Sequence, residues 1–186
     1  MILESPERVT EYTACGWWGD KTLSDLFRAN VERSPDAVAL VDPPNRAALA
    51  AGEQRRLTYA ELQTATDRLA GALLTAGVGR DDVVMAQLPN IAELVMVYLA
   101  CARIGAILTP LPVQFRTHEL RQAMTLTEPK VFITTGSFGG HDHVAMVQGL
   151  RADFPSLAHV FALGDELPEG VSSLGAILAT ATDTGA

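Results

Sequence analysis

Hydrophobic residues follow two alternating spacings along the chain from residue 58 onward. Short, nearly continuous apolar runs at 83–88, 106–111, 131–134 and 159–163 are typical of strands buried on both faces. Between them, apolar residues recur every three or four positions at 58–77, 117–127 and 141–154, and residues 91–104 are apolar almost all round, which predicts helices. Such alternation of helix and strand predicts an α/β fold, a three-layer αβα sandwich with a mostly parallel sheet.

Residues 82–112 are expected to form a right-handed βαβ unit at the centre of this sheet. Pro89 ends the first strand, and Asn90 is the predicted N-cap of a largely buried helix that ends at Gly105. Glu93 is a carboxylate on this otherwise apolar helix. We expect it to reach back to the helix cap, which is a structural role and not a catalytic one.

The chain before residue 58 is predicted from local signals. Capping boxes at residues 22–25 and 58–61 start two helices. The apolar run 37–41 predicts a strand, against which residues 56–58 could pair as an antiparallel edge, with a mobile connection at 42–55. Residues 1–21 are predicted to be an irregular N-terminal arm, with Trp17 or Trp18 packed on the domain surface.

This pattern predicts three parts. They are the arm (1–21), an α/β subdomain (22–163), and a weak helix at 171–179 within a linker-like tail (164–186).

Composition excludes some classes of binding partner and indicates the cellular compartment. The chain has 186 residues, is 48% hydrophobic and carries a formal net charge of -8, so a nucleic acid or an anionic membrane surface is not an expected partner. The N-terminus lacks a basic region before an apolar run, and the most apolar segment, about fourteen residues, is too short to span a bilayer. Two unrelated cysteines fit a reducing compartment, and we expect a cytoplasmic protein.

Candidate chemistry is sparse. The glycine-rich turn at 134–140 follows a strand but matches neither the dinucleotide fingerprint nor a Walker A loop. The triplet His141-Asp142-His143 could seed a metal site, although a solvated helix start with Asp142 in its first turn is the favoured interpretation. No catalytic, cofactor-binding or metal-binding residue is therefore assigned.

Residues 22–42, 56–90 and 91–134 together resemble the N-terminal run of the adenylate-forming acid ligases, the AMP-dependent synthetase/ligase superfamily. The resemblance rests on the Leu-Thr-Tyr-x-Glu-Leu helix start, the Leu-Pro-Asn turn, the helix ending in Gly-Ala and the proline-bounded strand. It implies a whole enzyme that uses ATP and Mg²⁺ to join a carboxylic acid to AMP, with release of pyrophosphate. The acyl group would then pass to a thiol of CoA or of a carrier protein.

Within the superfamily, the lead-in at 7–27 is most similar to aryl-acid–AMP ligases of the dihydroxybenzoate-activating kind, and acyl-CoA ligases remain open. The superfamily's phosphate loop, its aromatic-Gly-x-Thr-Glu motif, its ribose-binding Asp and its catalytic Lys do not occur in these 186 residues. We therefore expect an N-terminal fragment that needs the rest of the ligase chain and holds no bound cofactor alone. The alternative is a naturally truncated, non-catalytic binding or scaffolding module.

The first prediction concerns the isolated chain. We expect the purified 186-residue protein to show no ATP–pyrophosphate exchange with any carboxylic acid, because stabilising a pentavalent α-phosphorus needs cations and donors placed around it. Isotope exchange with a panel of aryl and medium-chain acids measures this, and robust exchange would overturn it.

Overall fold

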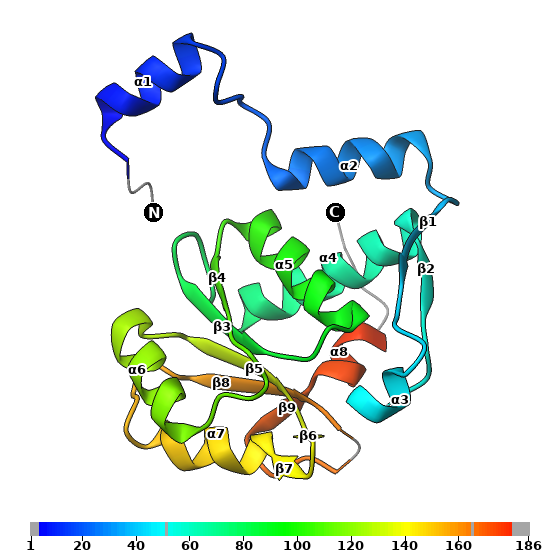
Figure 1. Cartoon of the computed structure of the whole chain (residues 1–186), viewed down its shortest axis with the longest axis vertical. Helices are drawn as coiled ribbons and strands as arrows, with labels where there is room; N and C mark the ends of the chain where they lie inside the picture. The colour runs from blue at the N-terminus through cyan, green and yellow to red at the C-terminus, as the bar shows by residue number, and fades with distance from the viewer. Residues whose placement is uncertain (1–3, 51, 165, 180–186) are drawn as a thin grey trace.

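The computed structural model describes residues 4–50, 52–164 and 166–179, and shows helices on both faces of a five-stranded sheet (Figure 1). The helices are α1 (Pro6–Ala14), α2 (Leu23–Arg33), α3 (Arg46–Leu49), α4 (Tyr59–Thr75), α5 (Ala92–Ile104), α6 (Thr117–Thr127), α7 (His143–Arg151) and α8 (Leu174–Ala179). The strands are β1 (Val38–Val41), β2 (Arg56–Thr58), β3 (Val83–Gln87), β4 (Ile107–Pro110), β5 (Val131–Thr135), β6 (Ser137–Phe138), β7 (His141–Asp142), β8 (His159–Leu163) and β9 (Val171–Ser173).

The main sheet has the order β4-β3-β5-β8-β9, and every neighbouring pair is parallel. The predicted α/β class and parallel sheet are confirmed. The prediction of a helix beginning at Val171 is wrong: Val171–Ser173 joins the sheet as β9, and the helix starts only at Leu174. The Ser173 hydroxyl marks this start, because it accepts a hydrogen bond from the Ala176 amide at 3.1 Å. Residues 180–186 of the predicted tail lie outside the described residues.

The sheet separates two hydrophobic cores, because successive side chains of a strand point to opposite faces. Val84 and Ile133 face α4, α5 and α8, where they join the larger core. Met85 and Phe132, their neighbours along β3 and β5, face α6 and α7 in the smaller core. This two-faced burial explains why the strands appear in the sequence as continuous apolar runs.

Several local predictions are confirmed in the first sixty residues and at the end of α5. Both capping boxes form, at Thr22 with Asp25 and at Thr58 with Glu61. Strand β1 pairs antiparallel with β2 as predicted, in a separate two-stranded sheet. Gly105 ends α5 in the left-handed conformation, with φ of 73°, which is the C-cap role predicted for it.

The N-terminal arm differs from its prediction. Pro6–Ala14 form α1, with the Ser5 side chain accepting a hydrogen bond from the Arg8 amide at its start. Trp17 and Trp18 both pack edge-on against Tyr12, with ring centroids 5.3 and 5.2 Å apart, so the aromatic contacts lie within the arm. Helix α1 stands apart from the sheet in Figure 1.

None of the described helices combines the length and apolar character needed to cross a bilayer.

A second prediction follows from the amino ends of β3 and β5. Asp82 Oδ2 accepts hydrogen bonds from Lys130 Nζ at 2.7 Å and from the Gly79 amide at 2.8 Å, and these bonds lower the pKa of Asp82. A carboxyl with a lowered pKa stabilises the fold above its ordinary pKa, 3.8, and this stability is lost as pH falls through the folded-state value. We expect Asp82→Asn to cost about 0.5–1 kcal/mol at pH 7.

Urea unfolding at a series of pH values measures the difference, which should shrink as the solution is acidified below pH 3.8. The exposed Asp36→Asn is the matched control and should leave the unfolding free energy unchanged. A loss for Asp82→Asn that is independent of pH would contradict the assignment.

Candidate functional site

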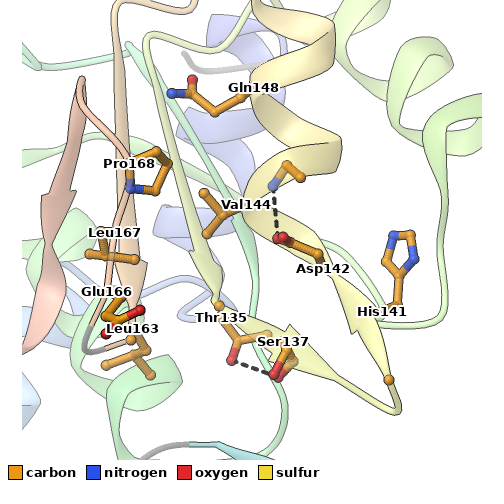
Figure 2. Close-up of a pocket in the computed structure, with 14 residues that line it drawn as sticks. Thr135, Ser137, His141, Asp142, Val144, Gln148, Leu163, Glu166, Leu167 and Pro168 are labelled. Atoms are coloured by element: carbon orange, nitrogen blue, oxygen red, sulfur yellow. Dashed lines mark hydrogen bonds between the residues drawn. The ribbon is translucent and has the colours of Figure 1, made fainter.

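A pocket of about 1000 Å³ lies at the carboxyl ends of β5 and β8 (Figure 2). In open parallel sheets, ligands bind outside the carboxyl ends of the strands. The walls come from the end of β5, the β6–β7 hairpin, the first turns of α7 and the segment after β8. The lining includes Thr135, Gly136, Ser137, Gly140, His141, Asp142, Val144, Ala145, Gln148, Leu163, Gly164, Glu166, Leu167 and Pro168. We call this the edge pocket.

The glycine-rich turn at 134–140 forms part of a short antiparallel hairpin. Ser137 pairs with Asp142 and Phe138 pairs with His141. Gly139 and Gly140 make the reversal, with φ of 56° and 76°. The hairpin therefore gives the edge pocket an ordered wall.

Gly136 joins β5 to this hairpin at a point of close backbone approach. A Cβ atom at this position would lie 2.8 Å from the Leu163 carbonyl oxygen, which is nearer than real Cβ atoms come. The residue must therefore be glycine for β5 and β8 to keep their spacing at the pocket.

The triplet at 141–143 is not a uniformly solvated helix start. Asp142 is the N-cap of α7, and its Oδ1 accepts a hydrogen bond from the Ala145 amide at 2.8 Å. His143 is fully buried, with Nε2 3.0 Å from the Val113 carbonyl oxygen and Nδ1 3.1 Å from that of His141. Asp142 is exposed as predicted, but it is the N-cap and does not lie in the first turn. The prediction is wrong for His143, whose ring ties α7 to the loop after β4.

The alternative of a metal site gains no support. The rings of His141 and His143 lie 5.0 Å apart between centroids and meet edge to face. Over the described ranges, no three His, Cys, Asp or Glu side chains gather closely enough to hold a metal ion. Desolvation lowers the pKa of His141, and the charges of Arg116 and His143 act in the same direction.

The charges on the edge pocket do not suit a nucleotide polyphosphate. Asp142 and Glu166 bring carboxylates to its wall, and its described lining contains neither lysine nor arginine. A bound polyphosphate needs cations and backbone donors, and Asp142 already accepts the hydrogen bond of one α7 donor, the Ala145 amide. The described lining of the edge pocket therefore does not fit a Mg²⁺–ATP complex, and we assign no phosphate chemistry to it.

A second pocket of about 560 Å³ lies at the carboxyl ends of β3 and β4 and is mostly apolar. Its described lining is Leu49, Leu88, Pro89, Asn90, Leu94, Tyr98, Pro110, Leu111, Pro112, Val113, Gln114 and Phe138. One wall is the loop after β4. This loop is held by the buried Gln87, whose Nε2 donates to the Pro112 and Phe115 carbonyl oxygens at 2.9 and 3.0 Å. The carboxyl edge thus carries two pockets, and carboxylate side chains are among the lining residues of the first.

A cluster of buried charged side chains supports this edge of the sheet. It was not predicted from the sequence. Arg46 Nη1 and Nη2 donate to the two carboxylate oxygens of Glu93, both at 2.8 Å. Arg46 Nη1 also donates to Asp42 Oδ2 at 2.9 Å. The three side chains are almost completely buried. We call these residues the Arg46 cluster.

The Arg46 cluster corrects two predictions. Residues 42–55 are not simply a mobile connection, since they contain α3 and the buried Arg46. The N-cap of α5 is Ile91 rather than Asn90, and no side chain next to it caps the helix. Asp42 Oδ1 accepts the bond from the Ala92 amide instead, at 2.7 Å, while Glu93 binds Arg46.

One signal could have found the Arg46 cluster. A single carboxylate on an apolar helix needs a buried cation, and the chain offered Arg46 in the i+4 position after Asp42. The spacing alone does not say that this pair meets Glu93.

Comparison with known proteins identifies the family to which this chain belongs. The AMP-binding enzyme family matches residues 27–174, which is most of the chain and nearly the whole sheet. The chain therefore belongs to the AMP-binding enzyme family.

Individual relatives agree with this. The medium-chain fatty-acid–CoA ligase of Escherichia coli K12 is 31% identical over 90% of this chain and 28% of its own length. The salicyl-AMP ligase / salicyl-S-ArCP synthetase of Mycobacterium tuberculosis is 32% identical over 87% of this chain and 28% of its own length. The apo structure of Mycobacterium smegmatis MbtA matches with a TM-score of 0.79 at 26% identity, over 96% of this chain and 31% of that one. The chain thus spans less than a third of these relatives.

A third prediction concerns the Arg46 cluster. Arg46→Leu removes the buried guanidinium that binds Asp42 and leaves Glu93 with the partly exposed Arg55, so we expect it to lower the unfolding free energy by about 3–5 kcal/mol. Denaturant unfolding measures the loss. The exposed Arg33→Leu is the control, expected to change stability by no more than about 0.5 kcal/mol. A cost for Arg46→Leu as small as that of the control would show that the cluster adds nothing.

Proposed function

We propose that this chain is part of an ATP-dependent carboxylic-acid ligase. The proposed reaction joins an acid to ATP, forming an acyl-adenylate and pyrophosphate, and then transfers the acyl group to a thiol. The observation that carries the proposal is the match of the AMP-binding enzyme family over residues 27–174. The printed names of the relatives, which are fatty-acid–CoA and salicyl-AMP ligases, support an acid as the substrate class.

The finer proposal is that the described residues position the reactants and do not catalyse the reaction. The carboxyl-edge pockets support this role. One has carboxylates among its lining residues and the other is lined mainly by apolar residues, while the cations near them are engaged within the protein. Arg116, for example, donates to the Val113 and Phe115 carbonyl oxygens. We therefore place ATP, Mg²⁺ and the catalytic groups on other parts of a longer ligase chain.

The acceptor thiol is proposed to belong to CoA or to a carrier protein. The relatives include both a CoA ligase and an aryl-carrier-protein synthetase by name, so the proposal keeps both acceptors. We also propose a cytoplasmic location, supported by the two free cysteines, Cys15 and Cys101.

The fourth prediction tests the ligase proposal in two steps. We expect the reading frame to continue beyond Ala186 into a Ser/Thr/Gly-rich loop that ends in Pro-Lys-Gly. We then expect the protein encoded by the complete frame to catalyse acid-dependent ATP–pyrophosphate exchange with an aryl or medium-chain acid. Transfer to CoA and to a carrier protein, assayed separately, distinguishes the two acceptors.

A stop codon directly after Ala186 would sink the ligase proposal in favour of a binding or scaffolding module. So would a folded full-length protein without exchange activity on the whole panel of acids. The 186-residue chain serves as the control for background exchange in both assays.

A further inference from the structure

A smaller pocket lies between β2, α4 and α8, on the face of the sheet that carries the larger core. Its volume is about 410 Å³. Leu57, Ala65, Met96 and Leu178 are its apolar lining, and Arg55, Arg68, Glu61 and Thr64 are its polar lining. Two guanidinium groups therefore line one small hollow, in a chain whose net charge is negative. We call it the arginine pocket.

Arg68 holds one wall of this pocket. Its Nη1 donates to the Leu178 carbonyl oxygen at 2.7 Å, which fixes the guanidinium at the end of α8. Its Nε is buried and has no hydrogen-bond acceptor among the described residues. A buried, charged donor without an acceptor calls for a bound water or ion, and the residue that carries it lines the arginine pocket.

Arg55 supplies the second cation. Its Nη2 lies 3.2 Å from Glu93 Oε1, an oxygen that Arg46 Nη2 already contacts at 2.8 Å. One carboxylate is thus shared by two guanidinium groups, and the Arg55 side chain remains 34% exposed. Charge-assisted bonds to a further anion are therefore available to Arg55.

Glu61, the acidic residue of the lining, does not replace that anion. Its Oε2 accepts hydrogen bonds from the Thr58 amide at 2.8 Å and from the Thr58 hydroxyl at 3.0 Å. These bonds form the capping box of α4 and hold the carboxylate at the start of the helix.

We propose that the arginine pocket binds a small oxyanion, a phosphate or carboxylate group, between Arg55 and Arg68. Planar guanidinium groups match the oxygens of both anions. The site is independent of the proposed ligase reaction, since it uses none of the carboxyl-edge pockets described above and can be tested in the absence of turnover.

The fifth prediction uses the 186-residue chain and the arginine side-chain Nε–Hε signals in ¹H–¹⁵N NMR spectra. Inorganic phosphate and acetate are titrated separately at constant ionic strength and pH. We expect the Arg68 Nε–Hε signal to shift saturably with at least one of them, while the signal of the exposed Arg33 stays in place. A response to phosphate alone assigns a phosphate site, and a response to acetate assigns a carboxylate site.

Arg68→Lys separates hydrogen-bond geometry from charge, because lysine keeps the charge and lacks the Nε donor. We expect it to weaken binding by at least about tenfold, and Arg33→Lys to leave binding unchanged. If Arg68→Lys does not fold, Arg55→Gln tests the same affinity. The proposal fails if the Arg68 signal shifts with neither anion, if Arg68 and Arg33 respond alike, or if a folded variant at Arg68 or Arg55 binds as well as the wild type.

Discussion

The Arg46 guanidinium, held between Asp42 and Glu93, is the contact on which the carboxyl edge of the sheet depends. Removing charges from water is costly, and their mutual attraction offsets that cost only when the hydrogen bonds are complete. Here the bonds are short, and Asp42 also accepts from the Ala92 amide at the start of α5. The Arg46 cluster thus joins the β1–β2 segment, α3 and α5. It also fixes the position of the turn after β3, which lies beside the second pocket, at the carboxyl ends of β3 and β4.

The elements of the sheet could be predicted because their signals are local. Four of the five strands of the main sheet follow from continuous apolar runs, and α2 and α4 follow from capping boxes that lie within four residues. Gly105 marks the end of α5 through a conformation that glycine adopts easily. Strand β9 was not predicted, because Val171–Ser173 is short and forms a strand through its pairing with β8.

The site could not be predicted in the same way, because its contacts join distant residues. Glu93 lies 47 positions from Arg46, and the Ala92 amide lies 50 positions from Asp42. The predicted bond from Glu93 to the helix cap rests on local sequence alone. In the folded chain Glu93 binds instead a buried cation that is distant in the sequence. His143 follows the same logic: its burial comes from the loop after β4, thirty positions earlier, and no helical periodicity reports it.

Family membership and local chemistry lead to different statements about this chain. The family is defined by AMP binding, yet Asp142 and Glu166 face the edge pocket, and nearby arginines donate inward to Glu93 and to loop carbonyl oxygens. A polyanion is stabilised by cations that remain free to meet it. At the described carboxyl edge, the charged side chains instead bind other groups of the protein and hold its own loops in place. The pockets there present a shaped and largely pre-formed surface. In the proposed ligase, rigid support of this kind would serve catalytic groups supplied by other parts of the protein, since small displacements of reacting groups are costly.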